Sequence, residues 1–140
     1  MARLPGTPVE TKITKLDMIR HHLTAAVQMI AIKCNPYSTH VIVKAANEMI
    51  EVIARQTGVP LDWDPDLLIK DEHIKDYRKL ANKAYNYLKH ADKDANDPYD
   101  GPAHSDLCKL NDVLSLFNLN GYQALGGKLS PTLAEFSSMA

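Results

Sequence analysis

The sequence predicts an all-α fold: a bundle of four main helices with additional short helices. Apolar residues recur at spacings of three and four in four long segments, which is the period of an α-helix. Proline, glycine and polar turn residues separate these segments, and no credible pair of strands occurs. The 140 residues and the hydrophobic content of 45% are typical of a single domain with its own core, so we treat 1–140 as one unit.

The first expected helix covers residues 10–34 and follows an irregular N-terminal segment, 1–9, which contains two prolines and a glycine. Two apolar stripes lie on nearly opposite sides of this helix. The stripe expected to face the core consists of Leu16, Ile19, Leu23, Ala26, Val27 and Ile30. The other consists of Met18, Ala25, Met29 and Ile32. A second stripe needs a partner of its own, so we expect a homodimer through this face.

The second helix is expected from Ser38 or Thr39 to Thr57, because Asn35-Pro36 disfavours helix before it and Gly58 ends it. Its apolar residues cover more than half the circumference, which places it at the centre of the bundle. They are Val41, Ile42, Val43, Ala45, Ala46, Met49, Ile50, Val52, Ile53 and Ala54. The remaining polar strip carries His40, Lys44, Asn47, Glu48, Glu51 and Arg55.

Two further long helices are expected at 71–91 and 105–118, separated by a polar, turn-rich loop. We take Asn120-Gly121 as a helix breaker and Ser130-Pro131 as the start of a last short helix. Leu107, Leu110, Leu114 and Phe117 are expected to face inward from the fourth helix.

Charge and composition exclude several classes of protein. The formal net charge is −1, which argues against nucleic acid or an anionic membrane as the main partner. The first residues contain no signal peptide, and no apolar run approaches the roughly 20 residues of a membrane span. We therefore expect a cytoplasmic protein.

The polar side of the third helix holds the candidate site. Asn82, Asn86 and His90 form an i, i+4, i+8 row, and Lys89 lies beside them. Histidine is suited to proton transfer near neutral pH, and lysine with asparagine can hold an anion or a phosphate. The alternative is that this face is merely solvated and keeps the helix soluble.

We predict no metal and no cofactor. Three pairs at i, i+4 contain ligand side chains, but such pairs arise readily by chance and no Glu-x-x-His pair occurs. They are Asp17 with His21, His90 with Asp94, and His104 with Cys108. The acidic loop that begins at Asp92 has neither the glycine nor the glutamate that a calcium loop requires. Cys34 and Cys108 lie in helical apolar patterns and are expected to be buried free thiols.

Two segments, PYSTHVIVKAANEMIEVIARQTG and IKDEHIKDYRKLANKAYNYLKHADKD, carry a family resemblance. Together they resemble a bacterial all-helical family of uncharacterised activity whose signature is Asn-aromatic-aromatic-Lys-His-Ala-Asp; Leu88 stands at the second aromatic place. The resemblance covers about residues 13 to 100. It implies an all-helical fold and a binding set of His40, Asn86, Lys89, His90 and Asp92.

The arrangement is also similar to the ribonuclease domains called HEPN, which are helical, often dimeric and metal-independent. Their motif is an arginine followed after four to six residues by a histidine near a helix end. Here His90 stands for the histidine, and Ala84, Tyr85 or, one step closer than the motif allows, Asn86 stands for the arginine.

These observations lead to one expectation and two alternatives. The first is a non-enzymatic binding or interaction module with a polar site near His40 and His90. The alternatives are a HEPN-like ribonuclease, with His90 as acid or base, and a metal-dependent enzyme.

Overall fold

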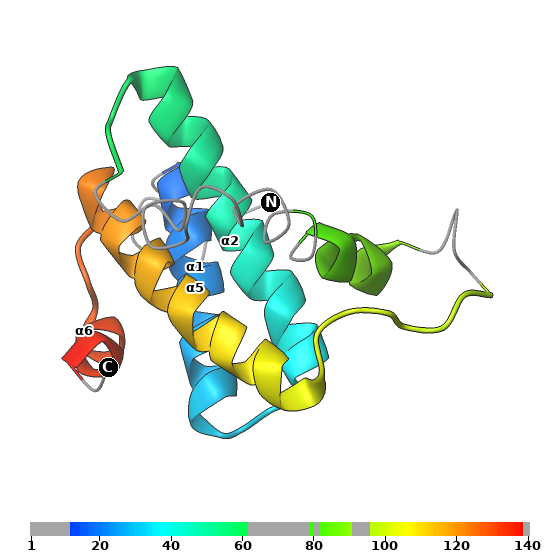
Figure 1. The fold of residues 1–140 in the computed structure, drawn as a ribbon. Helices are drawn as coiled ribbons and strands as arrows, with labels where there is room; N and C mark the ends of the chain where they lie inside the picture. The colour runs from blue at the N-terminus through cyan, green and yellow to red at the C-terminus, as the bar shows by residue number, and fades with distance from the viewer. Residues whose placement is uncertain (1–11, 62–78, 80–81, 91–95, 139–140) are drawn as a thin grey trace, which may run out of the picture.

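The computed structural model describes residues 12–61, 79, 82–90 and 96–138, and it is all-α as the sequence predicts. Within the described residues there is no strand. The helices are α1 (Lys15–Ala31), α2 (Pro36–Thr57), α5 (His104–Ala124) and α6 (Pro131–Ser138), and residues 82–89 are also helical. The first three pack together, whereas the helical segment 82–89 lies to one side of them (Figure 1). Most of the helix expected at 71–91 lies outside the described residues.

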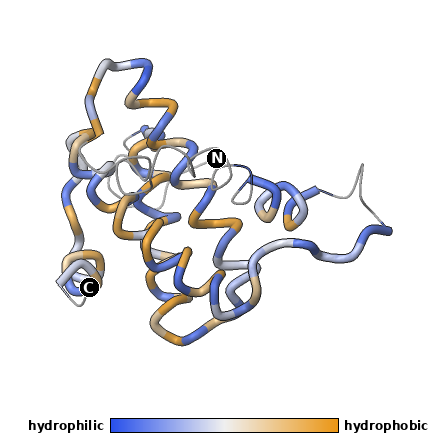
Figure 2. The backbone as a smooth tube through the Cα atoms, viewed as in Figure 1, coloured by the Kyte–Doolittle hydropathy of each residue, from blue (hydrophilic) through white to orange (hydrophobic). Residues whose placement is uncertain are grey.

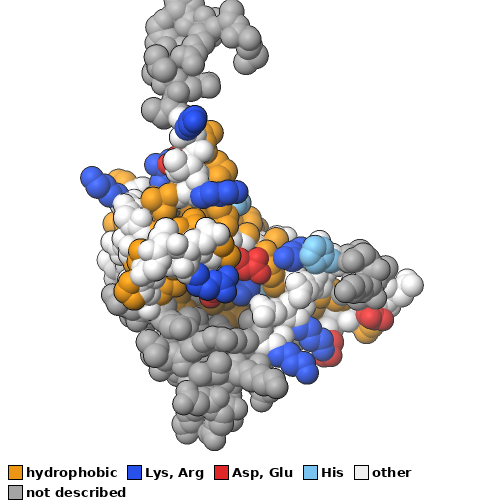
Figure 3. Space-filling model, turned by 90° about the horizontal axis from the view of Figure 1, so that it is seen from above, with side chains coloured by type: hydrophobic (Ala, Val, Ile, Leu, Met, Phe, Trp, Pro, Cys, Tyr) orange, Lys and Arg blue, Asp and Glu red, His pale blue; other side chains and the backbone are white. Residues whose placement is uncertain are grey.

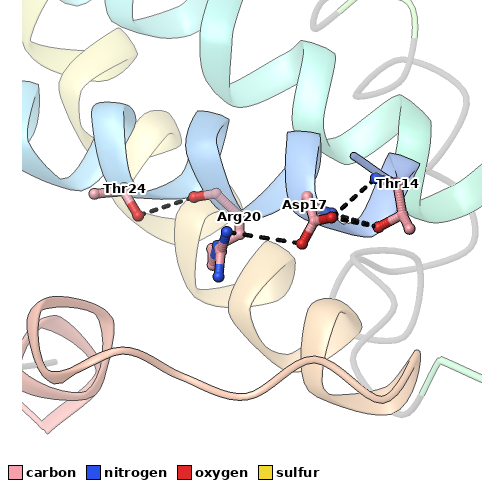
Figure 4. A network of polar contacts seen from close by, with 4 residues as sticks. All are labelled: Thr14, Asp17, Arg20 and Thr24. Atoms are coloured by element: carbon pink, nitrogen blue, oxygen red, sulfur yellow. Dashed lines mark hydrogen bonds and ion pairs between the residues drawn. The ribbon is translucent and has the colours of Figure 1, made fainter. Parts of the chain in front are cut away.

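A capping box fixes the start of α1. The backbone N–H of Asp17 donates to the Thr14 Oγ1 at 3.1 Å, and the Asp17 carboxylate accepts from the Thr14 backbone N–H at 2.9 Å (Figure 4). The backbone N–H and the hydroxyl group of Thr14 both donate to the Asp17 carboxylate, and these two bonds lower the pKa of the Asp17 carboxyl group below its usual value. The helix therefore begins at Lys15, later than the apolar pattern predicts, because the pattern carries no information about caps.

The second helix begins earlier than predicted. Asn35 caps it by accepting a hydrogen bond from the Tyr37 backbone N–H at 2.8 Å, and Pro36 occupies the first turn, where its missing N–H costs nothing. The predicted end is confirmed, because Gly58 adopts the left-handed conformation, with φ of 70°.

The fourth long helix, α5, is longer than predicted and continues through Gly121 to Ala124. A β-carbon at Gly121 would lie only 2.6 Å from Cγ2 of Ile50, so the missing side chain lets α5 approach α2 closely. The glycine that looked like a breaker is thus a packing residue inside the helix. The predicted start of the last helix is confirmed, since α6 begins at Pro131 after Ser130.

The core lies between α1, α2 and α5, and α6 covers one side of it with Leu133, which is fully buried. Apolar stretches gather along the facing sides of the packed helices (Figure 2). Ile19, Leu23 and Val27 of the predicted inward stripe are buried. Val52, expected in the core, is 40% exposed, because α2 presents this position away from α1 and α5.

The surface shows two further features. In the stripe predicted to form a dimer, Met18, Ala25 and Met29 are half-buried within the chain and Ile32 is 76% exposed. On the face seen in Figure 3, positive and negative side chains are interspersed over the described surface. Among the described residues, no helix combines the length and the apolar character that crossing a bilayer requires.

Candidate functional site

A buried polar contact joins α2 to α5. His40 of α2 is fully buried, and its Nδ1 lies 2.8 Å from Oδ1 of Asn111. The Nδ2 of Asn111 donates to the backbone oxygen of Pro36 at 3.0 Å, so the amide orientation is set and Oδ1 can only accept. Nδ1 of His40 therefore carries the hydrogen of this contact and donates it to Asn111.

The same arrangement recurs one heptad further along both helices. Asn47 donates to Oδ1 of Asn118 at 3.1 Å, and Nδ2 of Asn118 donates to the backbone oxygen of Val43 at 3.0 Å. The pairs of His40 with Asn111 and Asn47 with Asn118 advance together, so α2 and α5 run parallel (Figure 1). We call these two contacts the asparagine clamps.

The helical segment 82–89 reaches the first clamp through Tyr85. The Tyr85 ring is 5% exposed and meets the His40 ring edge-on, with centroids 6.5 Å apart and planes at 83°. The Nζ of Lys89 lies 3.8 Å from the centroid of the same ring, within cation–π distance. Tyr85 thus connects two residues that the sequence nominated, His40 below it and Lys89 above it.

Lys44 completes this region. It lies one turn after His40 on α2 and is only 8% exposed, although within the described part of the chain no hydrogen bond or ion pair holds its ammonium group. Burial lowers the pKa of Lys44 below its ordinary value, the charges of Glu51 and Glu48 raise it, and the positive charge of Lys89 lowers it. A buried lysine near a second lysine is a costly arrangement that a bound anion would relieve.

The other predicted site residues lie apart from the clamp. Asn86 and His90 are exposed, and the His90 backbone N–H donates a hydrogen bond to the Asn86 backbone oxygen at 3.1 Å. Asn86 lines a pocket of about 640 Å³ on the opposite side of the 82–90 segment. Asp92 lies outside the described residues. The structure therefore brings His40 and Lys89 to one place but not Asn86 or His90.

Ligand-type side chains elsewhere form a second pocket. Cys34 and Cys108 both line a cavity of about 370 Å³, and both are half-buried rather than buried as predicted. Sγ of Cys108 lies 3.9 Å from Nδ1 of His104, so this predicted pair is close in space. Within the described part of the chain, no three His, Cys, Asp or Glu side chains lie close enough to share a metal ion.

At the place that the HEPN resemblance assigns to an arginine, Ala84 and Tyr85 are buried and Asn86 is exposed. Sequence reasoning missed the roles of Tyr85, Asn111 and Lys44. The polar strip of α2 could have indicated these roles. His40, Lys44 and Asn47 are spaced by four and three residues along the strip and therefore share one face of the helix.

Comparison of the chain with protein-family models, with curated proteins and with solved structures found no match.

Proposed function

We propose that this protein is a non-enzymatic binding module for a small anionic ligand, held where the 82–90 segment packs on α2. Lys44 and Lys89 are its main contacts, and Tyr85 is the surface between them. The observation that carries the proposal is the state of Lys44: an ammonium group on a side chain that is nine-tenths buried, with no ion pair among the described residues.

Electrostatics favour an anion at this place. An anion near Lys44 would stabilise its charged form, against which burial and Lys89 both act. Lys89 is exposed and already oriented by its contact with Tyr85, so less side-chain entropy is lost when it closes on a ligand. Two ammonium groups near one another suit a compact anion such as phosphate, whose oxygens can meet both, although Glu48 and Glu51 partly offset their charge.

The position of His40 supports binding rather than catalysis. Its ring has no exposed surface and is fixed by Asn111, so it does not meet a ligand in this conformation. In this proposal His40 is a positioning residue that supports the Tyr85 ring, while His90 and Asn86 are exposed and take no part in the site.

The test is a titration of the full chain with inorganic phosphate and pyrophosphate, followed by nuclear magnetic resonance. We expect saturable shifts centred on Lys44 and Tyr85. Lys44→Met or Lys89→Met should weaken binding at least about tenfold, since hydrogen bonds to charged groups contribute roughly 1.5–3 kcal/mol. Lys128→Met, at an exposed lysine outside the site, should bind as wild type does.

Two results would contradict the proposal. One is equal weakening in all three lysine variants, which would indicate only general attraction between charges. The other is cleavage of an RNA oligonucleotide in the presence of a chelator, abolished by His90→Ala, which would favour a HEPN-like ribonuclease.

A further inference from the structure

The pocket of about 640 Å³ lies between the 82–90 segment and the loop that leads to α5. Its walls combine two tyrosine rings with three charged groups and one amide; the residues are Lys83, Asn86, Tyr87, Asp97, Tyr99 and Asp100. Its volume falls in the range of pockets that hold small organic ligands. None of these residues belongs to the lysine site proposed above.

Internal hydrogen bonds occupy the polar ends of both rings. The Tyr87 hydroxyl donates to the backbone oxygen of Asp97, and the Tyr99 hydroxyl donates to the backbone oxygen of Pro102, each at 2.9 Å. The two ring centroids lie 5.4 Å apart with planes at 58°. The rings therefore offer the pocket their π systems, which carry partial negative charge on their faces.

Gly101 makes room for one of these rings. A β-carbon there would lie 2.5 Å from the Tyr99 hydroxyl oxygen and 2.6 Å from the ring carbon that bears it. Any larger residue would displace the Tyr99 ring, so the shape of this wall depends on glycine.

The charges of the pocket do not cancel. Nζ of Lys83 pairs with the Asp100 carboxylate at 2.7 Å, and this contact lowers the pKa of Asp100. The Asp97 carboxylate has no such pair among the described residues, because Tyr87 binds only its backbone. One uncompensated carboxylate beside two aromatic rings is the combination that attracts an organic cation.

We infer that this pocket binds a small organic cation, with an alkylated ammonium or a guanidinium head, between Tyr87 and Tyr99 and against Asp97. The site is separate from the proposed anion site, and a test of one proposal does not decide the other.

Two matched pairs of probes test the inference on the full chain, by nuclear magnetic resonance titration. The quaternary ammonium choline is compared with its neutral isostere 3,3-dimethylbutan-1-ol, and methylguanidinium with N-methylurea. We expect one or both cations to shift the signals of Tyr87, Tyr99 and Gly101, and the neutral partners to bind about tenfold more weakly or not at all. Equal binding of a cation and its neutral isostere would overturn the inference, as would no binding of either cation.

Two variants of the pocket should change the affinity for the cation in opposite directions. Asp97→Asn removes the uncompensated charge and should weaken cation binding about tenfold, whereas Lys83→Met frees Asp100 and should strengthen it. Asp106→Asn, at an exposed carboxylate outside the pocket, should change nothing. Tyr99→Leu and Gly101→Ala should both weaken binding, and their melting curves show whether the fold is intact. Weakening by Lys83→Met, or no effect of Asp97→Asn, would contradict the assignment.

Discussion

Asn111 satisfies two buried groups with one side chain. It accepts from the His40 ring and donates to the Pro36 carbonyl oxygen, and it is itself 1% exposed. A residue of this kind stabilises the fold mainly because its removal leaves other buried polar groups without partners.

Replacement of this amide should therefore be costly. Asn111→Ala removes the acceptor for the Nδ1–H of His40 and a donor to the carbonyl oxygen of Pro36, and we expect the free energy of unfolding to fall by about 1–3 kcal/mol. Urea denaturation monitored by circular dichroism measures this loss. Gln123→Ala, at an exposed amide of the same helix, should change stability by no more than about 0.5 kcal/mol. Equal effects of the two changes would mean that the clamp contributes nothing particular.

Lys44 predicts a specific dependence of stability on pH. Its pKa is lower in the folded protein than the ordinary 10.5, so between the two values the unfolded chain holds one more proton than the folded chain. The free energy of unfolding contributed by this group therefore rises with pH across that window, and below it the buried charge is a cost.

Lys44→Met should remove this dependence. We expect the variant to be more stable than wild type at neutral pH, and the difference between them to shrink as the pH approaches 10.5. Comparing denaturation curves of the two proteins over this range isolates Lys44, because all other titrating groups are common to both. A constant difference between wild type and variant would show that the pKa of Lys44 is not lowered by folding.

At the scale of the helices, the sequence predicted which segments are helical better than where they begin. The apolar period identified α1, α2 and α5, Gly58 correctly marked the end of α2, and Pro131 correctly marked the start of α6. The starts of α1 and α2 depend on hydrogen bonds that the side chains of Thr14 and Asn35 accept, and the apolar period carries no information about these caps.

The sequence indicated the α2 side of the site but not the residues of α5 that pair with it. The family resemblance nominated His40, and the polar strip of α2 places Lys44 on the same face, but the strip does not say which helix covers it. Asn111 and Asn118 come from a segment 71 residues away, and such a pairing is a property of the tertiary fold. The regular spacing of the exposed row that ends at His90 favoured it as a site. The contact between Lys89 and the Tyr85 ring lies instead on the neighbouring face of the same helical segment.

Gly121 gives a prediction about the helix pair. Alanine in place of glycine within a helix usually stabilises by up to about 1 kcal/mol, because the unfolded chain has fewer conformations to lose. Here the added methyl group would press on Ile50 of α2, and overpacking costs about 1–3 kcal/mol. Gly121→Ala should therefore lower the melting temperature rather than raise it.

A second change separates the clash from the helix itself. Combining Gly121→Ala with Ile50→Ala removes the Cγ2 methyl group that the new β-carbon would meet, so the double variant should lose less stability than the sum of the two single changes. Additive losses in the double variant would mean that the two side chains do not meet.

At the scale of the molecule, the second stripe of α1 predicts a homodimer. Met18, Ala25 and Met29 are only half-buried by the rest of the described chain, and Ile32 is 76% exposed at the end of this row. Sedimentation at micromolar concentration should give twice the 15.6 kDa of one chain.

The chain supplies a matched control for this interface. Ile32→Asp should shift the equilibrium to the monomer, because it introduces a charge into the apolar face. Ile13→Asp alters an equally exposed isoleucine, 70% accessible, that is not part of the stripe, and should leave the dimer intact. A wild-type monomer would contradict the prediction, and so would equal dissociation by both changes.

The asparagine clamps also set the order of events when the chain is made. Each links α2 to a residue 71 positions later, and closing a loop of that length costs about 4 kcal/mol of chain entropy. At roughly 5–20 residues per second, a ribosome needs roughly 4–14 seconds to deliver the matching asparagine. During that delay α2 presents His40 and Asn47 to water, which satisfies their hydrogen bonds at no cost. An all-apolar row would expose additional apolar surface during the same interval, so we expect the polar row to reduce aggregation of the nascent chain.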